Sequence, residues 1–373
     1  MRHLMPAEVF PPGEYLKDVL EARGWSQTEF AEIIGRPTRV VNEIIVTKRS
    51  ITPETARELA AALDTSAQYW LNLESAYQLS RVPPVNERIS REATLRRRFP
   101  VREMMKRGWI PETDDFEVLE KSTYAFFDIA AANDDILFSH AARRSAPQSD
   151  ITELQWAWIF RVGQLAEASQ LPPYSAAKLR EALPALEALM TEPEEVRHVP
   201  RILAECGVRF VIVEPIPGSE IHGVCFWLND GKSPVIGLTL KWDYIDRFWF
   251  NLRHEIEHVL NGDGKSGVIT DVFDEPGDDE EQCEIVANAA GAEFCVPQAR
   301  LMDFMARHHP AYSTKNFIGF CRLVGRHPGI VAGQLQRKIG DPRLFKKFQA
   351  RVRNLLIETA VTDGYGRRVM FED

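Results

Sequence analysis

Two histidines and a glutamate form the pattern in this chain with the clearest chemical meaning. His254 and His258 are four residues apart, and Glu255 directly follows the first of them. The apolar residues around this pattern predict a helix, in which positions i and i+4 project from the same face. Two imidazoles placed in this way can hold one zinc ion, with Glu255 beside the metal as a general base for water. Zn²⁺ is therefore the predicted cofactor.

A catalytic zinc site uses three protein ligands, so the histidine pair needs a partner. Glu284 is the candidate because it lies in a predicted helix with small residues one and two turns further on. Small residues allow this helix to approach the histidine helix closely, which would bring the carboxylate to the metal. Glu281 is the alternative third ligand. The alternative for His254 and His258 is a pair of histidines on a helix surface, without a metal.

The chain before the histidine helix has the alternation and the β-branched residues of short strands. Strands are predicted at residues 208–213, 223–228 and 234–240. A small sheet that leads into such a helix is the zincin arrangement, in which an edge strand can hold an extended peptide through its backbone.

The first eighty residues predict about five short helices with turns between them, which is the plan of a helix-turn-helix domain. The third helix, starting near Thr38, would enter the major groove of DNA. Its outward polar residues are the candidates for contacts with base edges, and Gln27, Lys48 and Arg49 are the candidates for contacts with phosphates. The base-edge candidates are Thr38, Arg39, Asn42 and Glu43. A small helical protein-interaction module is the alternative interpretation.

Four segments of this region resemble a known family: residues 12–16, 25–31, 48–56 and 69–73. They look like the HigA-type antitoxins of the XRE helix-turn-helix family, and the similarity covers about the first eighty residues. The resemblance implies binding to double-stranded operator DNA, often as a dimer. It also makes a homodimer and a cognate toxin candidate partners of this chain.

The charge of this region is unusual for a DNA-binding domain. Residues 1–80 contain eight lysines and arginines against eleven aspartates and glutamates. A basic stretch of eight lysines and arginines follows between residues 88 and 107. It could extend the contact with phosphates, pair with the acidic residues 278–281, or form a solvated helix face.

Length and composition limit the number of domains and the kinds of partner that this chain can have. A chain of 373 residues is too long for one compact core. Its formal net charge of −9 argues against a general polyanion binder. No apolar run reaches the ~18 residues of a membrane span, and the N-terminus lacks a signal peptide, so no membrane partner is expected. The five cysteines include no Cys-x-x-Cys pair, which fits a reducing cytoplasm.

The predicted fold class is α+β and mostly helical. The predicted domains are a five-helix helix-turn-helix bundle at residues 1–80, a basic and helical connecting region at 81–199, and a zincin-like domain at 200–373 with a small sheet and the histidine helix.

A second resemblance covers residues 200–340. The Phe-Trp-Phe sequence before His254, the pattern Glu284-x-x-Ala287-Asn288-x-x-Gly291 and the segment 327–336 look like the ImmA/IrrE metallopeptidases. The resemblance implies a zinc endopeptidase with His254, His258 and Glu284 as ligands and Glu255 as the base. Members of that family typically cleave a transcriptional repressor, and some are fused to helix-turn-helix domains.

Glu257 departs from the family pattern, because metallopeptidases prefer an uncharged residue there. It is expected to face solvent or an arginine. The predicted function is a DNA-binding zinc endopeptidase that acts on a repressor or related regulator in stress, phage or toxin–antitoxin control. The alternative is a HigA-like antitoxin or repressor whose metallopeptidase-like domain senses or docks without catalysis.

Overall fold

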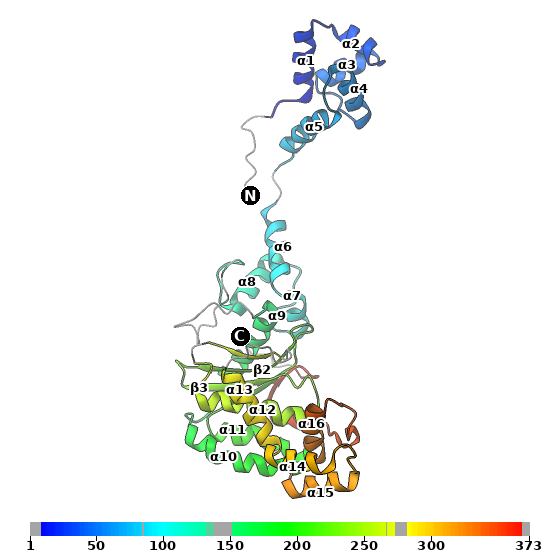
Figure 1. Cartoon of the computed structure of the whole chain (residues 1–373). Helices are drawn as coiled ribbons and strands as arrows, with labels where there is room; N and C mark the ends of the chain where they lie inside the picture. The colour runs from blue at the N-terminus through cyan, green and yellow to red at the C-terminus, as the bar shows by residue number, and fades with distance from the viewer. Residues whose placement is uncertain are drawn as a thin grey trace. The chain divides into compact units, whose positions relative to one another are not determined.

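The computed structural model (Figure 1) describes residues 9–83, 86–132, 134, 136, 151–265, 267–272 and 282–367. The chain divides into two compact units, Met1–Ile89 and Ser90–Asp373. Among the helices in these described ranges, none combines the length and the apolarity that crossing a lipid bilayer requires.

The N-terminal unit consists of five helices, as the sequence predicts. They are α1 (Pro12–Arg23), α2 (Gln27–Ile33), α3 (Thr38–Ile45), α4 (Pro53–Leu63) and α5 (Ala67–Arg81). The start of α2 is a capping box, in which the Ser26 hydroxyl accepts from the Glu29 amide and the Glu29 carboxylate accepts from the Ser26 amide. Thr52 and Ser66 cap the starts of α4 and α5 with their side-chain hydroxyls, without the reciprocal bond of a capping box. Local sequence signals thus set the start of three of the helices.

A single apolar core holds these helices together. It contains buried side chains from all five helices, among them Leu16, Phe30, Val41, Leu59 and Trp70. The turn between α2 and α3 passes through Gly35, which has a φ of +65° and therefore a left-handed backbone conformation that favours glycine. The α2–turn–α3 arrangement is a helix-turn-helix.

The C-terminal unit is built on a five-stranded mixed sheet with the strand order β4-β2-β3-β1-β5. The strands are β1 (Arg209–Val213), β2 (Ile221–Leu228), β3 (Ser233–Leu238), β4 (Ile269–Val272) and β5 (Val361–Asp363). β1 runs parallel to β3 and β5, whereas β2 runs antiparallel to β3 and β4. The first three strands agree with the predicted ones, and β4 and β5 add an edge on each side.

Helices cover both faces of the sheet, so its strands are apolar on both sides. Val211, Val224 and Val235 pack into one core with α9 (Glu153–Glu167). The alternate residues Ile212 and Cys225 pack into a second core with α12 (Ile245–Asn261). In Figure 1, α9 lies on one side of the sheet, and α10, α11 and α12 lie on the other.

The segment between the N-terminal unit and the sheet, predicted as a connecting region, contributes to these cores. Leu95, Met104, Phe116 and Phe127 share the core of α9 and the sheet. The remaining helices are α6 (Glu87–Arg98), α7 (Val101–Arg107), α8 (Phe116–Phe127), α10 (Ala176–Ala188), η1 (Leu189–Thr191), η2 (Pro193–His198), α11 (Val199–Glu205), α13 (Gln282–Cys295), α14 (Gln298–His308), α15 (Thr314–Val324), α16 (Pro328–Ile339), η3 (Lys346–Phe348) and α17 (Arg353–Ile357).

The short strand β5 is held by a buried polar contact. Asp363 forms an ion pair with Arg161 on α9 and accepts a hydrogen bond of 2.9 Å from the Trp109 indole. Asp363 and Arg161 are 2% and 3% exposed. A charged pair at this depth depends on both partners, so β5 is tied to the core far more firmly than its three residues suggest.

Candidate metal centre and DNA-binding face

The α12 helix positions the two histidines of the candidate metal site. Phe248, Trp249 and Leu252 pack its apolar face into the core beneath the sheet, and Gly262 ends it in a left-handed conformation. His254 and His258 are 2% and 0% exposed. The alternative of two histidines on a helix surface therefore does not describe them.

The α13 helix brings Glu284 to this pair. Its small residues face α12, as predicted: Ala287 and Gly291 are buried, and a Cβ at Gly291 would lie 3.1 Å from the Phe250 carbonyl oxygen. The close approach of the two helices places the first turn of α13 beside the histidines. The alternative ligand Glu281 lies outside the described residues.

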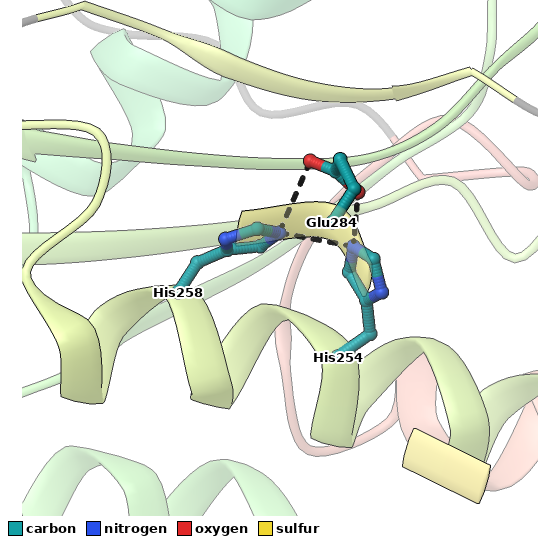
Figure 2. Close-up of side chains that lie close together, drawn as sticks. All are labelled: His254, His258 and Glu284. Carbon is teal, nitrogen blue, oxygen red and sulfur yellow. Dashed lines mark hydrogen bonds and ion pairs between the residues drawn. The ribbon is translucent and has the colours of Figure 1, made fainter. Parts of the chain in front are cut away.

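Three potential ligand atoms meet at one point (Figure 2). The Glu284 carboxylate oxygens lie 3.2 Å from His254 Nε2 and 3.3 Å from His258 Nε2. The two Nε2 atoms are 3.0 Å apart, and all three ligand atoms fall within 4.8 Å of one another. Two imidazoles and one carboxylate are the ligand set of one group of catalytic zinc sites, which leave a fourth position for water. The donor set thus fits a zinc ion.

Further polar groups orient the two imidazoles from behind. His258 Nδ1 lies 3.0 Å from an Asp263 carboxylate oxygen, and His254 Nδ1 lies 3.2 Å from the Asn288 side-chain oxygen. Contacts of this kind fix the ring orientation and the tautomer, and they leave each Nε2 for the metal. Neither role is among those predicted from the sequence. Signals existed, because Asn288 follows Glu284 by one helical turn and Asp263 follows the Gly262 helix end.

The electrostatics of the cluster reflect its burial and its mixed charges. Burial opposes the charged form of His258, but hydrogen bonds to Glu284 and Asp263, with the charge of Glu255, outweigh burial and raise the pKa of His258 to about 9. Burial likewise opposes ionisation of Glu284, and the two histidines outweigh it and lower the pKa of Glu284 to about 2. Without a metal, the cluster therefore favours a carboxylate paired with a protonated imidazole.

Glu255 faces the sheet from the same helix. Its side chain is 1% exposed, and its Oε1 would lie 2.1 Å from a Cβ built on Gly223 of β2. Only a glycine leaves room for the carboxylate at this point of the strand. The strand thus takes part in placing the predicted general base.

Glu257 has a structural explanation. It forms an ion pair of 2.7 Å with Arg253, one helical turn earlier, and the Arg253 guanidinium lies 6.0 Å from the centre of the Phe294 ring. Of the two expected neighbours, solvent or an arginine, the structure shows the arginine.

On the N-terminal unit, the predicted DNA-contacting residues gather along α2 and α3. Thr38, Arg39, Asn42, Lys48 and Arg49 are exposed, and Gln27 at the start of α2 is half-buried. The Asn42 side chain donates a hydrogen bond of 3.1 Å to the Gln27 side-chain oxygen. This contact joins the start of α2 to the outward face of α3.

Glu43 changes the charge balance of this face. It lies 2.7 Å from Arg39 and 2.9 Å from Arg49, and hydrogen bonds from these arginines lower the pKa of its carboxyl. Glu43 therefore pairs with two of the predicted DNA-contacting cations. Any contact of either arginine with DNA would have to compete with this pairing.

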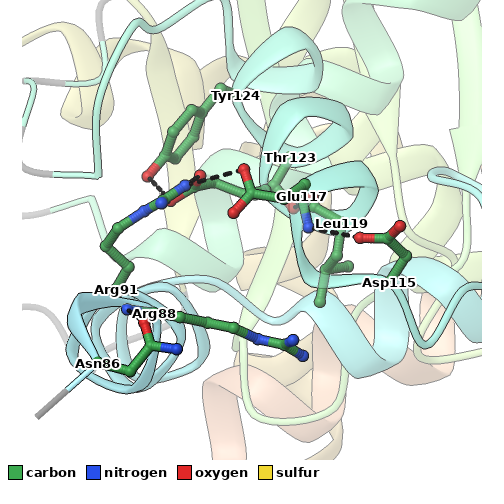
Figure 3. Close-up of polar contacts among 9 residues, drawn as sticks. Asn86, Arg88, Arg91, Asp115, Glu117, Leu119, Thr123 and Tyr124 are labelled. Atoms are coloured by element: carbon green, nitrogen blue, oxygen red, sulfur yellow. Dashed lines mark hydrogen bonds and ion pairs between the residues drawn. The ribbon is translucent and has the colours of Figure 1, made fainter.

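The basic stretch after the N-terminal unit is largely used within the protein. Arg91 pairs with Glu117 at 3.2 Å and also with Glu120, which accepts from Tyr124 as well. Figure 3 shows Arg91 directed toward the helix that carries Glu117 and Tyr124. Other pairs in this stretch are Arg96 with Glu92, Arg98 with Glu153, and Arg107 with Glu103. The acidic residues 278–281, considered as partners, lie outside the described residues.

Comparison with known families supports both the helix-turn-helix in the N-terminal unit and the metallopeptidase-like domain around the candidate metal site. Residues 16–70 match the helix-turn-helix family model, and residues 207–316 match that of the IrrE N-terminal-like domain of the Peptidase_M78 family. The second match includes the three residues of the candidate metal site.

Individual relatives match the N-terminal part of the chain. Virulence-associated protein A of Dichelobacter nodosus is 43% identical over 75 residues, which are 20% of this chain and 74% of that protein. An addiction module antidote protein of a HigA family from Coxiella burnetii is 34% identical, over 19% of this chain and 79% of that one, with a TM-score of 0.19. The Pseudomonas aeruginosa antitoxin HigA, solved with the higBA promoter, is 29% identical, over 21% and 100%, with a TM-score of 0.19.

The chain thus combines a helix-turn-helix domain with a metallopeptidase-like domain that contains a candidate metal site. Through its N-terminal domain it belongs to the helix-turn-helix family that includes virulence-associated protein A, and its C-terminal unit carries an IrrE N-terminal-like domain.

Proposed function

We propose that the chain is a DNA-binding zinc endopeptidase that cleaves a transcriptional repressor or related regulator. The observation that carries the proposal is the buried cluster of His254, His258 and Glu284, with Glu255 on the same helix. The division into residues 1–80, 81–199 and 200–373 is proposed with it, as a DNA-binding part, a connecting part and a peptidase part.

The chain's own residues supply two elements of peptide hydrolysis. His254, His258 and Glu284 would hold the zinc ion, which when bound acts as a Lewis acid toward water and the scissile carbonyl. Glu255 accepts a proton from the attacking water and then passes it to the leaving amine. Burial of Glu255 and its place against Gly223 hold the carboxylate in one position for both transfers.

The sheet offers a place for an extended substrate. β4 lies at one edge of the sheet, and its residue Asp271 pairs with Gly223, the residue that faces Glu255. A peptide could add to the outer edge of β4 by backbone hydrogen bonds, with β4 between it and Gly223. A protein segment in extended conformation is therefore the proposed form of the substrate.

The N-terminal unit is proposed to bind double-stranded operator DNA as a homodimer. The HigA structure solved with its promoter supports this, together with the exposed positions of Thr38, Arg39 and Asn42 on α3. Arg49, Lys48 and Gln27 would contact phosphates. Operator binding would place the peptidase at the genes whose regulator it cleaves.

The test combines metal analysis with cleavage assays on the full chain. Purified wild-type protein is expected to contain one zinc per chain, and the His254→Ala variant to lose it. The Glu255→Gln variant should keep zinc but fail to cleave a partner repressor that the wild-type protein cleaves. Undiminished cleavage by Glu255→Gln would refute the mechanism.

A second candidate is a HigA-like antitoxin or repressor whose peptidase-like domain senses or docks without catalysis. The 34% identity to an addiction module antidote protein of a HigA family favours it, because an antidote protein acts against a toxin. Tight operator binding, binding of a toxin encoded next to the gene, and absence of zinc in the purified protein would support this candidate over the first.

A further inference from the structure

A cavity of about 400 Å³ opens in the C-terminal unit where strands β1 and β5 begin. Its wall also contains residues of η2 and α11 and of the chain that follows α9. Small-molecule sites typically have volumes of ~300–1,000 Å³. Neither the candidate metal ligands nor the predicted DNA-contacting residues line this cavity. It is therefore separate from both sites described above.

Arg209, the first residue of β1, contributes a half-buried guanidinium to the wall. Its Nε donates a hydrogen bond of 3.2 Å to the Ala166 carbonyl in the last turn of α9. None of the carboxylates in the described ranges forms a hydrogen bond or an ion pair with this guanidinium. Burial alone lowers the pKa of Arg209, whereas carboxylate partners raise the pKa of Arg36 and of Arg91. The positive charge of Arg209 thus lacks an acidic partner in the described structure.

The other cationic side chains of the wall have partners of their own. Arg201 pairs with Glu205 at 2.6 Å, and Arg197 and His198 lie 3.8 Å and 3.6 Å from the carboxylate of Glu195. No acidic residue is among the described residues that line the cavity. The site therefore offers one uncompensated positive charge, which a ligand with one negative charge would balance.

A carboxylate fits this charge better than a phosphate does. Phosphate monoesters carry about −1.5 to −2 charges at neutral pH, so one guanidinium does not balance them. The planar fork of a guanidinium matches the two oxygens of a carboxylate, which can accept two parallel hydrogen bonds. The contact with Ala166 uses one of its five N–H donors.

The rest of the accessible wall is mainly apolar. Leu171 and Pro200 are half-buried, and Val361 is 39% exposed. The hydroxyls of Ser169 and Thr359 also line the cavity, but they donate to backbone carbonyls of their own segments at 3.3 Å and 3.4 Å. An apolar group in the cavity would therefore cover apolar surface without removing water from an unpaired donor.

We propose that this cavity binds a small organic monocarboxylate with an apolar body. Its carboxylate would accept hydrogen bonds from the terminal nitrogens of Arg209, and its apolar body would pack against Leu171, Pro200 and Val361. This ligand site is independent of the proposed peptidase and DNA-binding functions.

The test is isothermal titration of the full chain with 3-phenylpropionate, 3-phenylpropanol and inorganic phosphate. The carboxylate should bind with a dissociation constant below about 1 mM. The alcohol has the same apolar body without the charge, and phosphate has the charge without the apolar body. Each should bind at least about tenfold more weakly than 3-phenylpropionate, because each lacks one of the two contacts.

Variants test the assignment of the charge to Arg209. Arg209→Gln should weaken binding of 3-phenylpropionate at least about tenfold, the scale of a lost hydrogen bond to a charged group. Arg201→Gln is the matched control, since Arg201 lines the same cavity but is paired with Glu205. It should change the affinity less than about twofold. Leu171→Asp leaves Arg209 in place, and its new carboxylate should repel the ligand and abolish binding.

The titrations of the wild-type chain can overturn the proposal even if Arg209→Gln does not fold. No binding of 3-phenylpropionate up to about 10 mM would exclude the site. Equal affinity for the alcohol would indicate an apolar surface without charge recognition, and equal affinity for phosphate would indicate a general anion patch. Equal losses in Arg209→Gln and Arg201→Gln, or unchanged binding in Leu171→Asp, would likewise contradict the proposed site.

Discussion

Gly223 of β2 lies against the carboxylate of Glu255 on α12, so that a Cβ on the glycine would come within 2.1 Å of Glu255 Oε1. The strand and the helix therefore both fix the position of the predicted base. The proposed peptidase activity depends on that position, because a general base must reach the proton that it removes.

The Gly223→Ala substitution should displace Glu255 while leaving the histidines in place. We expect retained zinc content and a loss of peptide cleavage of at least about 100-fold, the scale of a lost general base. Cleavage of the regulator and metal content would be measured on the same preparation. Gly319→Ala is the control, since a Cβ there meets nothing within 4 Å. Normal cleavage by Gly223→Ala would show that Glu255 does not need this position.

Asp263 and Asn288 should set the affinity of the metal site. Asp263→Asn and Asn288→Ala leave the three candidate ligands intact. The first removes the negative charge beside His258 Nδ1, and the second removes the contact at His254 Nδ1. Each variant should bind zinc about 10–100-fold more weakly, measured by competition with a chelator. Asp303→Asn, which removes an exposed carboxylate paired with Arg307, should leave the affinity unchanged. An unaltered affinity in both variants would contradict the orienting role.

Glu43 should weaken DNA binding because it pairs with Arg39 and Arg49. In Glu43→Gln both arginines become available to DNA, Arg39 to base edges and Arg49 to phosphates, so affinity for operator DNA should rise by about three- to tenfold at low salt. The plot of log affinity against log salt concentration should also become steeper. Glu32→Gln changes the charge equally on the exposed surface of the same unit and serves as the control. Equal gains in the two variants would mean that charge alone, and not the pairing, is responsible.

His222 should make the C-terminal unit less stable in mild acid. It is 5% exposed, and burial, helped by Lys241 and Arg247, lowers its pKa from 6.5 to about 4. Between these values the unfolded chain binds a proton that the folded chain does not. The stabilising contribution is thus complete above about pH 6.5 and is lost as the pH falls toward about 4.

Urea unfolding of metal-free protein, followed by tryptophan fluorescence, would measure this effect. From about pH 7 to pH 5 the free energy of unfolding should fall by about 2 kcal/mol more in the wild type than in His222→Gln. Parallel pH dependence of the two proteins would show that His222 does not carry the effect.

Asp363 should matter more to stability than its place in a three-residue strand implies. Asp363→Asn removes the carboxylate that pairs with the buried Arg161, and breaking a buried ion pair typically costs about 3–5 kcal/mol. The free energy of unfolding of the C-terminal unit would be compared with that of Asp341→Asn, a substitution in an exposed pair with Arg343. If Asp363→Asn lowers the free energy of unfolding no more than Asp341→Asn does, the buried ion pair does not contribute to stability beyond an exposed one.

Much of this protein follows from local sequence alone. The spacing of His254 and His258, the capping residues Ser26 and Thr52, and the apolar periodicity of the helices are interactions within one or two turns. Such interactions do not depend on the rest of the fold, so the helix-turn-helix plan, the three central strands and the histidine helix could be predicted. Predicting Glu284 as a candidate ligand required two further observations, the small residues of its helix and a family resemblance.

Tertiary structure decided the remainder, because it depends on residues far apart in the chain. β5 pairs with β1 across about 150 residues, and three residues carry too little pattern to predict it. The fit of Gly223 to Glu255 and the cavity at Arg209 likewise arise where separate elements meet. Sequence determined which helix carries the histidines, because a helical period is local. Only the packing of strand, helix and loop decided which groups surround them, because side-chain neighbours are set by the fold.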